Sequence, residues 1–237
     1  MRNTYKSIII VAVVFTLGIL AWHNFSDSGV KSNAKNTDDK SNVTLNNSNK
    51  LSEEKTIEKS SRNIVIYNTH ADEEYVSGKK VTDAAALIND RLNKEGLNSK
   101  FIKCNPPKKY AKAYEASREI ITNNVKDYVN AVLLDIHRDI SENPKSDTKK
   151  ILITLAKKSP HYESNKKFAE NLLKEINKSK SVKGEITLFE QGILYFNQDL
   201  SSNSVLIELG NNKSSNSDVE ECINALVSAL KNVENIS

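Results

Sequence analysis

Short apolar runs alternate with helical apolar stripes from residue 62 onward, and this alternation restricts the folds open to the chain more than any other feature. The run at 131–136 is almost entirely apolar, which is typical of a strand buried in a parallel sheet. The expected strands lie at 63–68, 99–104, 131–136, 151–156, 185–196 and 204–209, and the strand at 185–196 is expected to be interrupted at Gly192. The expected helices lie at 82–95, 109–125, 163–177 and from a capping box at Ser217 and Glu220 onward. Strands that alternate with helices predict an α/β domain of three layers with a mostly parallel sheet.

The segment before this domain differs from it in composition. Residues 7–22 are almost continuously apolar and follow two positive charges, which predicts a transmembrane anchor over 1–23 with its positive end inside. A signal peptide is the alternative, although no small-x-small cleavage site follows the apolar run. Residues 24–61 are rich in Ser, Asn, Lys and Asp, a composition that predicts a disordered linker. We therefore expect a single-pass protein of the cell membrane, with its folded domain at 62–237 on the extracytoplasmic side.

The charge pattern argues against one class of partner. The formal net charge is +4, the lysines are scattered, and no basic cluster is interleaved with aromatic residues. Nucleic acid is therefore not an expected partner. The two cysteines, Cys104 and Cys222, would lie on the exported side, where a disulfide is chemically allowed. Cys222 shares the apolar face of the last helix with Val219 and Ile223, so we expect it to be a buried hydrophobic residue.

Metal-ligating side chains stand where two of the expected strands end. His70 and Glu73 follow the first strand, and His137 follows the third. In open α/β sheets, functional groups gather at the carboxyl ends of the strands. A zinc ion held by these three side chains would keep one position for water, which is the two-histidine, one-carboxylate arrangement of hydrolytic zinc enzymes.

A further carboxylate, Glu208, lies at the end of the expected strand at 204–209. Burying this charge is costly unless a reaction or an ion uses it. Glu208 is therefore a candidate to take a proton from an attacking water and pass it to a leaving amine. Asp135 shares a strand face with His137, and Asp139 lies two residues beyond it, so either is a candidate to orient an imidazole without contacting the metal.

Several neighbouring residues leave alternatives open. Spacing alone does not separate Glu73 from Asp72 or Glu74 as a ligand. His161 follows a proline in a loop, where exposure is the simpler expectation. Arg138 is either a surface charge or a clamp for a substrate carboxylate.

Five segments, in the same order along the chain, resemble motifs of the stage II sporulation protein P family. They are 66–75 for Y-H-T-H-x-x-E-x-Y, 114–118 for Y-x-x-S-R, 134–139 for D-x-H-R-D, 196–201 for F/Y-N-Q-x-L-S and 205–210 for L-I-E-x-G. The resemblance covers about 62–232, nearly the whole expected domain. Asn68 replaces the family's usual first histidine, and Ile140 stands where a small polar residue is common. Neither departure removes an expected ligand.

The resemblance implies a fold and an activity. Members of the family are membrane-anchored cell-wall hydrolases, related in fold to zinc N-acetylmuramoyl-L-alanine amidases. By resemblance, the folded region at 62–237 is a zinc amidase domain with Glu208 as its catalytic carboxylate. The implied ligands of Zn2+ are His70, Glu73 and His137, which favours Glu73 over its acidic neighbours.

The resemblance also implies partners in sporulation. The expected partners are peptidoglycan, the membrane, a sporulation lytic transglycosylase and a membrane partner of the complex that drives engulfment of the forespore. Arg138, Asn197 and Gln198 are expected to contact the glycopeptide. Two rival functions stay open: a zinc carboxypeptidase or endopeptidase that cuts stem peptides, and a non-catalytic module that binds the wall or recruits partners.

Overall fold

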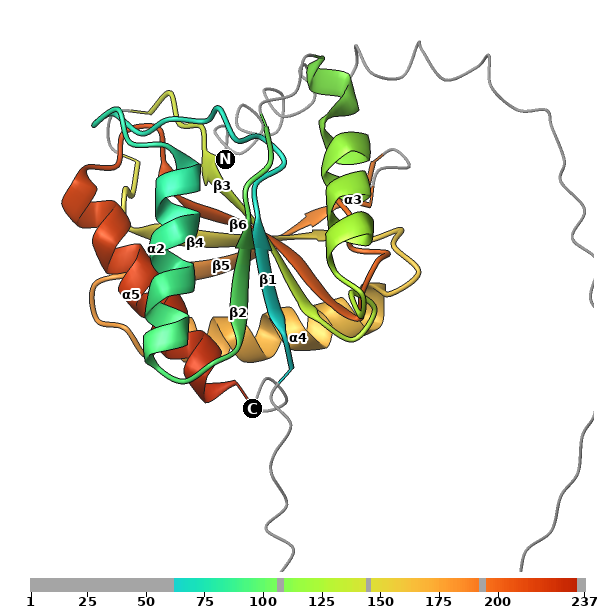
Figure 1. The fold of residues 1–237 in the computed structure, drawn as a ribbon. Helices are drawn as coiled ribbons and strands as arrows, with labels where there is room; N and C mark the ends of the chain where they lie inside the picture. Colours follow the sequence, from blue (N-terminus) through green and yellow to red (C-terminus); the bar gives the residue numbers. More distant parts are fainter. Residues whose placement is uncertain (1–61, 106–108, 144–145, 192–194, 234–237) are drawn as a thin grey trace, which may run out of the picture. The chain divides into compact units, whose positions relative to one another are not determined.

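The structure is a computed structural model that describes residues 62–105, 109–143, 146–191 and 195–233 (Figure 1). The expected anchor at 1–23 and the expected linker at 24–61 lie outside the described residues. The described residues fall within one compact unit of the chain. Among them, no helix is both long enough and apolar enough to cross a membrane.

Within the described residues, strands and helices alternate around one six-stranded sheet. The strands are β1 (Ile64–Tyr67), β2 (Ser99–Ile102), β3 (Val132–Asp139), β4 (Lys150–Ala156), β5 (Lys183–Phe189) and β6 (Asn203–Asn211). The helices are α2 (Val81–Lys94), α3 (Ala113–Asn124), α4 (Tyr162–Ile176) and α5 (Asn216–Asn232), with a short 3-10 helix, η2 (Tyr110–Lys112), before α3. The strand order is β2-β1-β3-β6-β4-β5, and every pairing is parallel except that of β4 with β6. The prediction of an α/β fold with a mostly parallel sheet is confirmed.

One face of the sheet, which we call the three-helix face, is covered by α2, α4 and α5. Alternate residues of each strand point to it, as the pleat of a strand requires. On β3 these residues are Val132, Leu134 and Ile136, which are all fully buried. They pack with apolar residues of the three helices in one continuous core. Cys222 of α5 is part of this core, as expected, and both cysteines are free and buried.

The opposite face, which we call the site face, carries Leu133, Asp135 and His137 of the same strand. In the described part of the chain, α3 is the helix that packs on this face, where Ile121 joins a smaller apolar cluster with Leu133 and Tyr67. Figure 1 shows α3 on the other side of the sheet from α2 and α5. The predicted three layers are therefore present, but the two outer layers differ in size.

Three local predictions were wrong. The expected strand at 185–196 ends as β5 at Phe189, and Phe196 and Asn197, at and just after its expected end, have φ angles of 51° and 57°. This left-handed conformation does not fit an extended strand. The expected helix at 109–125 begins with the 3-10 turn η2, so α3 starts only at Ala113.

The third error concerns the start of α5. The capping box there is formed by Ser215 and Asp218 and not by Ser217 and Glu220. Ser215 Oγ accepts a hydrogen bond from the backbone N–H of Asp218, and Asp218 Oδ2 accepts one from the backbone N–H of Ser215. Aspartate takes the place of the usual glutamate because its shorter side chain also reaches back to the cap residue.

Candidate functional site

The candidate site lies where β1, β3 and β6 run side by side on the site face. His137 of β3 is directly paired with Glu208 of β6 in the parallel register. Both side chains therefore point to the same face of the sheet. β3 continues through His137 to Asp139, with an irregularity in its pairing between these two residues, so His137 belongs to the strand and not to the loop after it.

His137 lies between two carboxylates. Its Nδ1 is 3.4 Å from Glu73 Oε2, and its Nε2 is 3.0 Å from Asp135 Oδ1. The second contact is close, but its direction falls short of a well-formed hydrogen bond. Burial disfavours the charged imidazole, yet Asp135 and Glu73 raise the pKa of His137 well above its usual value. A metal ion at Nδ1 would have to displace a proton from this imidazole.

His70 reaches the same place from the loop after β1. Its ring is buried, and its centroid lies 5.3 Å from the centroid of the His137 ring. Tyr110 stacks on His70 with a centroid distance of 4.0 Å and an interplanar angle of 13°, and Tyr114 meets the ring edge-on at 5.7 Å. Burial is the main cause that lowers the pKa of His70, and the nearby His137 acts in the same direction.

Glu73 is the acidic residue of its loop that turns toward His137. Glu73 Oε2 accepts a hydrogen bond of 3.1 Å from the backbone N–H of Arg138. Burial opposes ionisation of this carboxyl, but His137 and the Arg138 N–H leave its pKa below the usual value. Asp72 is exposed, and Glu74 forms a surface ion pair of 3.3 Å with Lys80. The structure thus brings Glu73 to His137 and leaves its two acidic neighbours outside.

Glu208 faces the site with one oxygen out of contact with water. Among the described residues, Glu208 Oε2 has no hydrogen-bond partner. Burial raises the pKa of this carboxyl to about 8, although the neighbouring charge of His137 acts in the opposite direction. A buried carboxylate oxygen without a donor is costly for a fold, so its position indicates use by a ligand or a reaction.

These side chains fit a zinc ion in kind and, for one pair, in spacing. Two atoms that each lie about 2.0–2.1 Å from a tetrahedral zinc are about 3.4 Å apart. His137 Nδ1 and Glu73 Oε2 have this separation. His70 Nδ1 is buried and lacks a hydrogen-bond partner in the described part of the chain. No group of three or more His, Cys, Asp or Glu side chains among the described residues is converged on a metal position. The structure therefore contains a pair at zinc spacing and a third nitrogen nearby.

Of the two residues expected to orient an imidazole, the structure brings Asp135 to His137 and leaves Asp139 apart. Asp135 is fully buried, whereas Asp139 Oδ1 accepts a hydrogen bond from the backbone N–H of Ile140. Asp139 Oδ2 lies 3.8 Å from Lys150 Nζ. Asp139 therefore contributes charge near the site without a described contact to either imidazole.

The residues expected to contact substrate have structural partners. The guanidinium of Arg138 donates from Nε to the carbonyl of Glu74 at 2.8 Å, which holds the acidic loop against β3. Gln198 is fully buried, and its amide group bonds the backbone of β4, accepting from Ala156 N and donating to Thr154 O. Asn197 is also buried and donates to Ser117 Oγ at 2.9 Å. Contact of Asn197 or Gln198 with substrate would require the side chain to leave these partners.

Sequence reasoning assigned no role to Thr69, Ser117 or Tyr110, which all contact the site. Thr69 and Ser117 lie inside the segments that resemble motifs of the family, and this position is the sequence feature that could have identified them. No feature of the sequence indicated Tyr110, because its contact with His70 depends on tertiary packing. His161 caps the start of α4 and is not among the residues that meet here.

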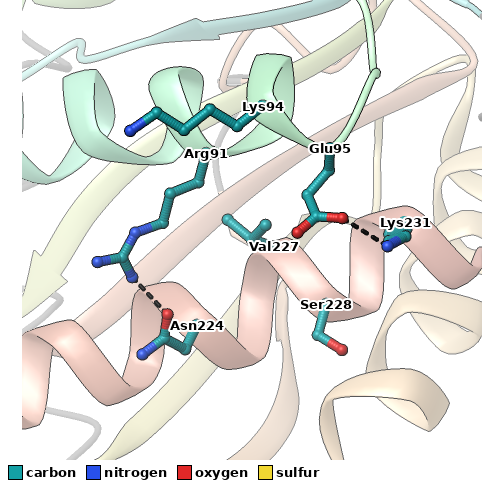
Figure 2. Close-up of a pocket in the computed structure, with 7 residues that line it drawn as sticks. All are labelled: Arg91, Lys94, Glu95, Asn224, Val227, Ser228 and Lys231. Carbon is teal, nitrogen blue, oxygen red and sulfur yellow. Dashed lines mark hydrogen bonds and ion pairs between the residues drawn. The ribbon is translucent and has the colours of Figure 1, made fainter.

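A hollow at the surface lies away from this site. It is lined by residues of α2 and α5, among them Arg91, Asn224 and Lys231 (Figure 2). Lys231 pairs with Glu95, and Arg91 bonds Asn224, so polar contacts bridge the hollow. Because α2 and α5 cover the three-helix face, the hollow is separated from His137 and Glu208 by the sheet.

Comparisons with known proteins agree with the fold and identify a family. The chain matches the family model described as Stage II sporulation protein P (SpoIIP) over residues 22–231. The catalytic domain of CwlV, an N-acetylmuramoyl-L-alanine amidase from Bacillus (Paenibacillus) polymyxa var. colistinus, is similar in structure with a TM-score of 0.50 and 11% identity. That match covers 74% of this chain and 99% of the other. It supports an amidase-like fold.

A curated relative points to the same family. The stage II sporulation protein P of Bacillus subtilis (strain 168) is 28% identical over 152 residues, which are 58% of this chain and 34% of that protein. The matched part thus spans about a third of the relative's length. Since the family model covers most of the sequence, the chain belongs to the stage II sporulation protein P family.

Proposed function

We propose that this chain is a peptidoglycan hydrolase that cleaves the amide bond between N-acetylmuramic acid and the L-alanine of the stem peptide, with zinc held by His70, Glu73 and His137. One observation carries the proposal. Two histidines and two carboxylates share a small region of the site face, and three of their polar atoms are buried without a hydrogen-bond partner among the described residues: His70 Nδ1, His137 Nε2 and Glu208 Oε2. The membership of the family and the amidase-like fold support the choice of reaction.

The reaction requires a base near the attacking water and an acid near the leaving nitrogen. Zinc bound at the three ligands would polarise the scissile carbonyl and lower the pKa of a water molecule. Glu208 would act as the proton carrier of this site, taking a proton from the attacking water and delivering it to the amine of L-alanine. Burial raises the pKa of this carboxyl to about 8, so its ionised form is a stronger proton acceptor than an exposed glutamate, and the charge of a bound zinc would favour that ionised form.

The surrounding residues hold the reacting groups in place. The Asp135 carboxylate lies against His137 Nε2, so it restricts rotation of the ring while Nδ1 faces Glu73. Arg138 secures Glu73 through its backbone N–H and secures the loop through its side chain. The OH of Tyr75 donates to the carbonyl of Leu209 at 3.0 Å, which ties the same loop to β6 beside Glu208.

The cellular setting is part of the proposal. The apolar N-terminal segment would anchor the chain as a single span, with the hydrolase domain outside the cytoplasm. Septal wall thinning and engulfment during sporulation are the proposed process. A sporulation lytic transglycosylase and a membrane partner of the engulfment complex are the proposed protein partners, by the membership of the family.

The first test uses the soluble domain from about Arg62 onward. Its zinc stoichiometry is measured, and the products of peptidoglycan digestion are analysed by mass spectrometry with and without a chelator. The proposal expects one zinc per chain and chelator-sensitive release of stem peptides with a free L-alanine amino terminus, leaving intact glycan. Shortened stems would instead identify a carboxypeptidase or endopeptidase. Absence of zinc and of products, also with the partner transglycosylase present, would leave a wall-binding module.

A further inference from the structure

We propose that Thr69, Ser117 and Asn197 form a one-way chain of hydrogen bonds that positions Asp135, and through Asp135 the imidazole of His137. The three residues are therefore positioning residues of the site, and they lie in three segments that are far apart in the sequence. The inference rests on the proposed zinc site for its functional consequence, although the hydrogen bonds themselves do not depend on it.

The chain ends at a carboxylate without access to solvent. Asp135 Oδ1 accepts a hydrogen bond of 2.8 Å from the backbone N–H of Thr69, and Asp135 Oδ2 accepts one of 2.6 Å from the Thr69 hydroxyl. Asp135 is fully buried, and Oδ1 also lies 3.0 Å from His137 Nε2. Thr69 thus holds both oxygens of the group that faces the imidazole.

The direction of each hydrogen bond follows from the number of protons available. The hydroxyl of Thr69 has one proton, and a carboxylate accepts without donating. Because Thr69 gives this proton to Asp135, Ser117 is the donor in its 3.0 Å hydrogen bond with Thr69 Oγ1, and the carbonyl of Tyr114, at 3.2 Å, is a more distant acceptor that competes for the same Ser117 proton. Ser117 Oγ in turn accepts from Asn197 Nδ2 at 2.9 Å. Every donor in the chain therefore points toward Asp135.

The far end of the chain depends on an unusual backbone conformation. Asn197 has a φ of 57°, in the left-handed region where asparagine is tolerated better than most residues. This turn buries its side chain and directs the amide N–H toward Ser117. The geometry gives Asn197 a role inside the protein, where the sequence had suggested a contact with substrate.

A firmly held carboxylate matters here because its contact with His137 is poorly aligned. Nε2 is within 3.0 Å of Asp135, but it lacks a well-formed hydrogen bond among the described residues. Aligned donors in a buried chain polarise and strengthen one another. Without the Thr69 hydroxyl, Asp135 Oδ2 loses its donor and the backbone N–H of Thr69 is left to hold the carboxylate through Oδ1, so the group that sets the orientation of the His137 ring is held less firmly. Removal of such outer partners in metal sites reduces metal affinity by about 10- to 100-fold.

The test compares substitutions in the full chain, purified in detergent. Zinc dissociation constants are measured by competition with a chromophoric chelator. Thr69→Val removes the hydroxyl with little change of shape and is expected to weaken zinc binding by about 10- to 100-fold. Thr69→Ser keeps the hydroxyl and is expected to bind like the unaltered protein. Ser117→Ala removes the two hydrogen bonds of the chain that involve Ser117 Oγ but keeps both bonds of Thr69 to Asp135, with an expected loss of about 2- to 10-fold.

A matched control separates positioning from general loss of stability. Thr122→Val removes a hydroxyl of α3 whose hydrogen bonds, among the described residues, go to carbonyls of its own helix, those of Arg118 and Glu119. We expect no change in zinc affinity for this variant. Equal affinities of Thr69→Val and Thr69→Ser, or an equal loss in Thr122→Val, would overturn the proposal.

A second measurement keeps the test independent of zinc. In the metal-free soluble domain, nuclear Overhauser effects between the ring protons of His137 and its neighbours report whether the imidazole keeps one orientation. We expect one orientation in the unaltered protein and in Thr69→Ser, and averaging over several orientations in Thr69→Val. If the unaltered protein binds no zinc, the proposed function fails, while this spectrum still decides the hydrogen-bond chain. Identical spectra for the two Thr69 variants would exclude it.

Discussion

The two faces of the central sheet use the same strands for different purposes. On the three-helix face, β3 presents Val132, Leu134 and Ile136 to one continuous apolar core. On the site face, the intervening residues of that strand include Asp135 and His137, both buried. A period of two in side-chain direction lets one strand serve both faces.

The two faces make opposite contributions to the stability of the fold. Each fully buried aliphatic side chain on the three-helix face contributes about 1.5–3 kcal/mol by leaving water. The site face buries charged and polar groups, which cost free energy unless each is paired. The apolar face therefore supports a site that would be unfavourable by itself. Substitutions should accordingly change activity when made on one face and stability when made on the other.

The sharpest expected difference comes from Glu208→Gln on the site face. Amide hydrolysis should fall by at least about 10²- to 10⁴-fold, because glutamine cannot take up the proton of the attacking water. Zinc stoichiometry should not change, and the midpoint of thermal unfolding should not fall, since the substitution removes a buried ionisable group. Stem-peptide release by the purified variant is the measurement.

A control for this variant lies on β5. Glu185 is partly exposed and pairs with Lys183 and Lys150, so Glu185→Gln changes a carboxylate to an amide away from the reaction. We expect its activity to match that of the unaltered protein. Retained hydrolysis in Glu208→Gln would remove Glu208 from the mechanism.

On the three-helix face, Leu134→Ala should act on stability alone. Leu134 is fully buried in the main core, and truncation of such a residue costs about 2–5 kcal/mol in the free energy of unfolding. Denaturation by urea measures this loss. The fraction that remains folded at low temperature should bind zinc and hydrolyse peptidoglycan normally.

Leu188→Ala is the matched control, because Leu188 of β5 is 44% exposed. Its free energy of unfolding should change by no more than about 0.5 kcal/mol. A Leu134→Ala protein that is stable but has lost zinc would contradict the separation between the two faces.

The two faces also differ in how well the sequence predicted them. Apolar periodicity was sufficient to predict the strands and helices that form the three-helix face, because the burial of alternate residues follows from the local pattern. The same rule placed Asp135 and His137 on one face of their strand, and the register of β3 with β6 brings Glu208 beside His137. The antiparallel direction of β4 relative to β6 has no signature in the local pattern, because both strands read as short apolar runs.

Buried polar residues on the site face were harder to interpret. Asn197 and Gln198 lie in a segment rich in polar residues, and such segments are normally exposed. Two consecutive left-handed residues turn this segment inward, so that its amides bond protein groups. Backbone conformation of this kind results from tertiary packing and leaves no periodic pattern to detect. The stacking of Tyr110 on His70 has the same origin.

A smaller effect on zinc affinity is expected at His70, which is packed against aromatic rings and not against a carboxylate. Asp135 lies against His137, whereas His70 is held by the rings of Tyr110 and Tyr114. Tyr110→Ala should weaken zinc binding by about 2- to 10-fold, since an aromatic pair contributes about 0.5–1.5 kcal/mol. Tyr110→Phe keeps the ring and should bind zinc normally. Chelator competition measures both variants, and equal losses in both would assign the effect to the hydroxyl instead of the stacking.

The smallest effect is expected at the ion pair that joins α3 to the segment after β5. Arg118 donates from Nη1 and Nη2 to the two carboxylate oxygens of Asp199, at 2.9 and 2.8 Å. The Arg118 side chain is 44% exposed, so solvent and salt screen the pair. Arg118→Gln should lower the free energy of unfolding by no more than about 1 kcal/mol.

A double-mutant cycle with Asp199→Asn isolates the interaction between the two side chains, and the coupling should shrink further in 1 M salt. Hydrolysis should stay within about twofold of the unaltered protein, because apolar packing of Ile121 and the Ser117 hydrogen bonds also hold α3 on the sheet. A coupling energy well above about 1 kcal/mol would mean that this one surface ion pair holds α3 on the site face. The site face would then contain a contact that stabilises the fold as much as a buried core residue does. The separation between stability on the three-helix face and activity on the site face would then be wrong.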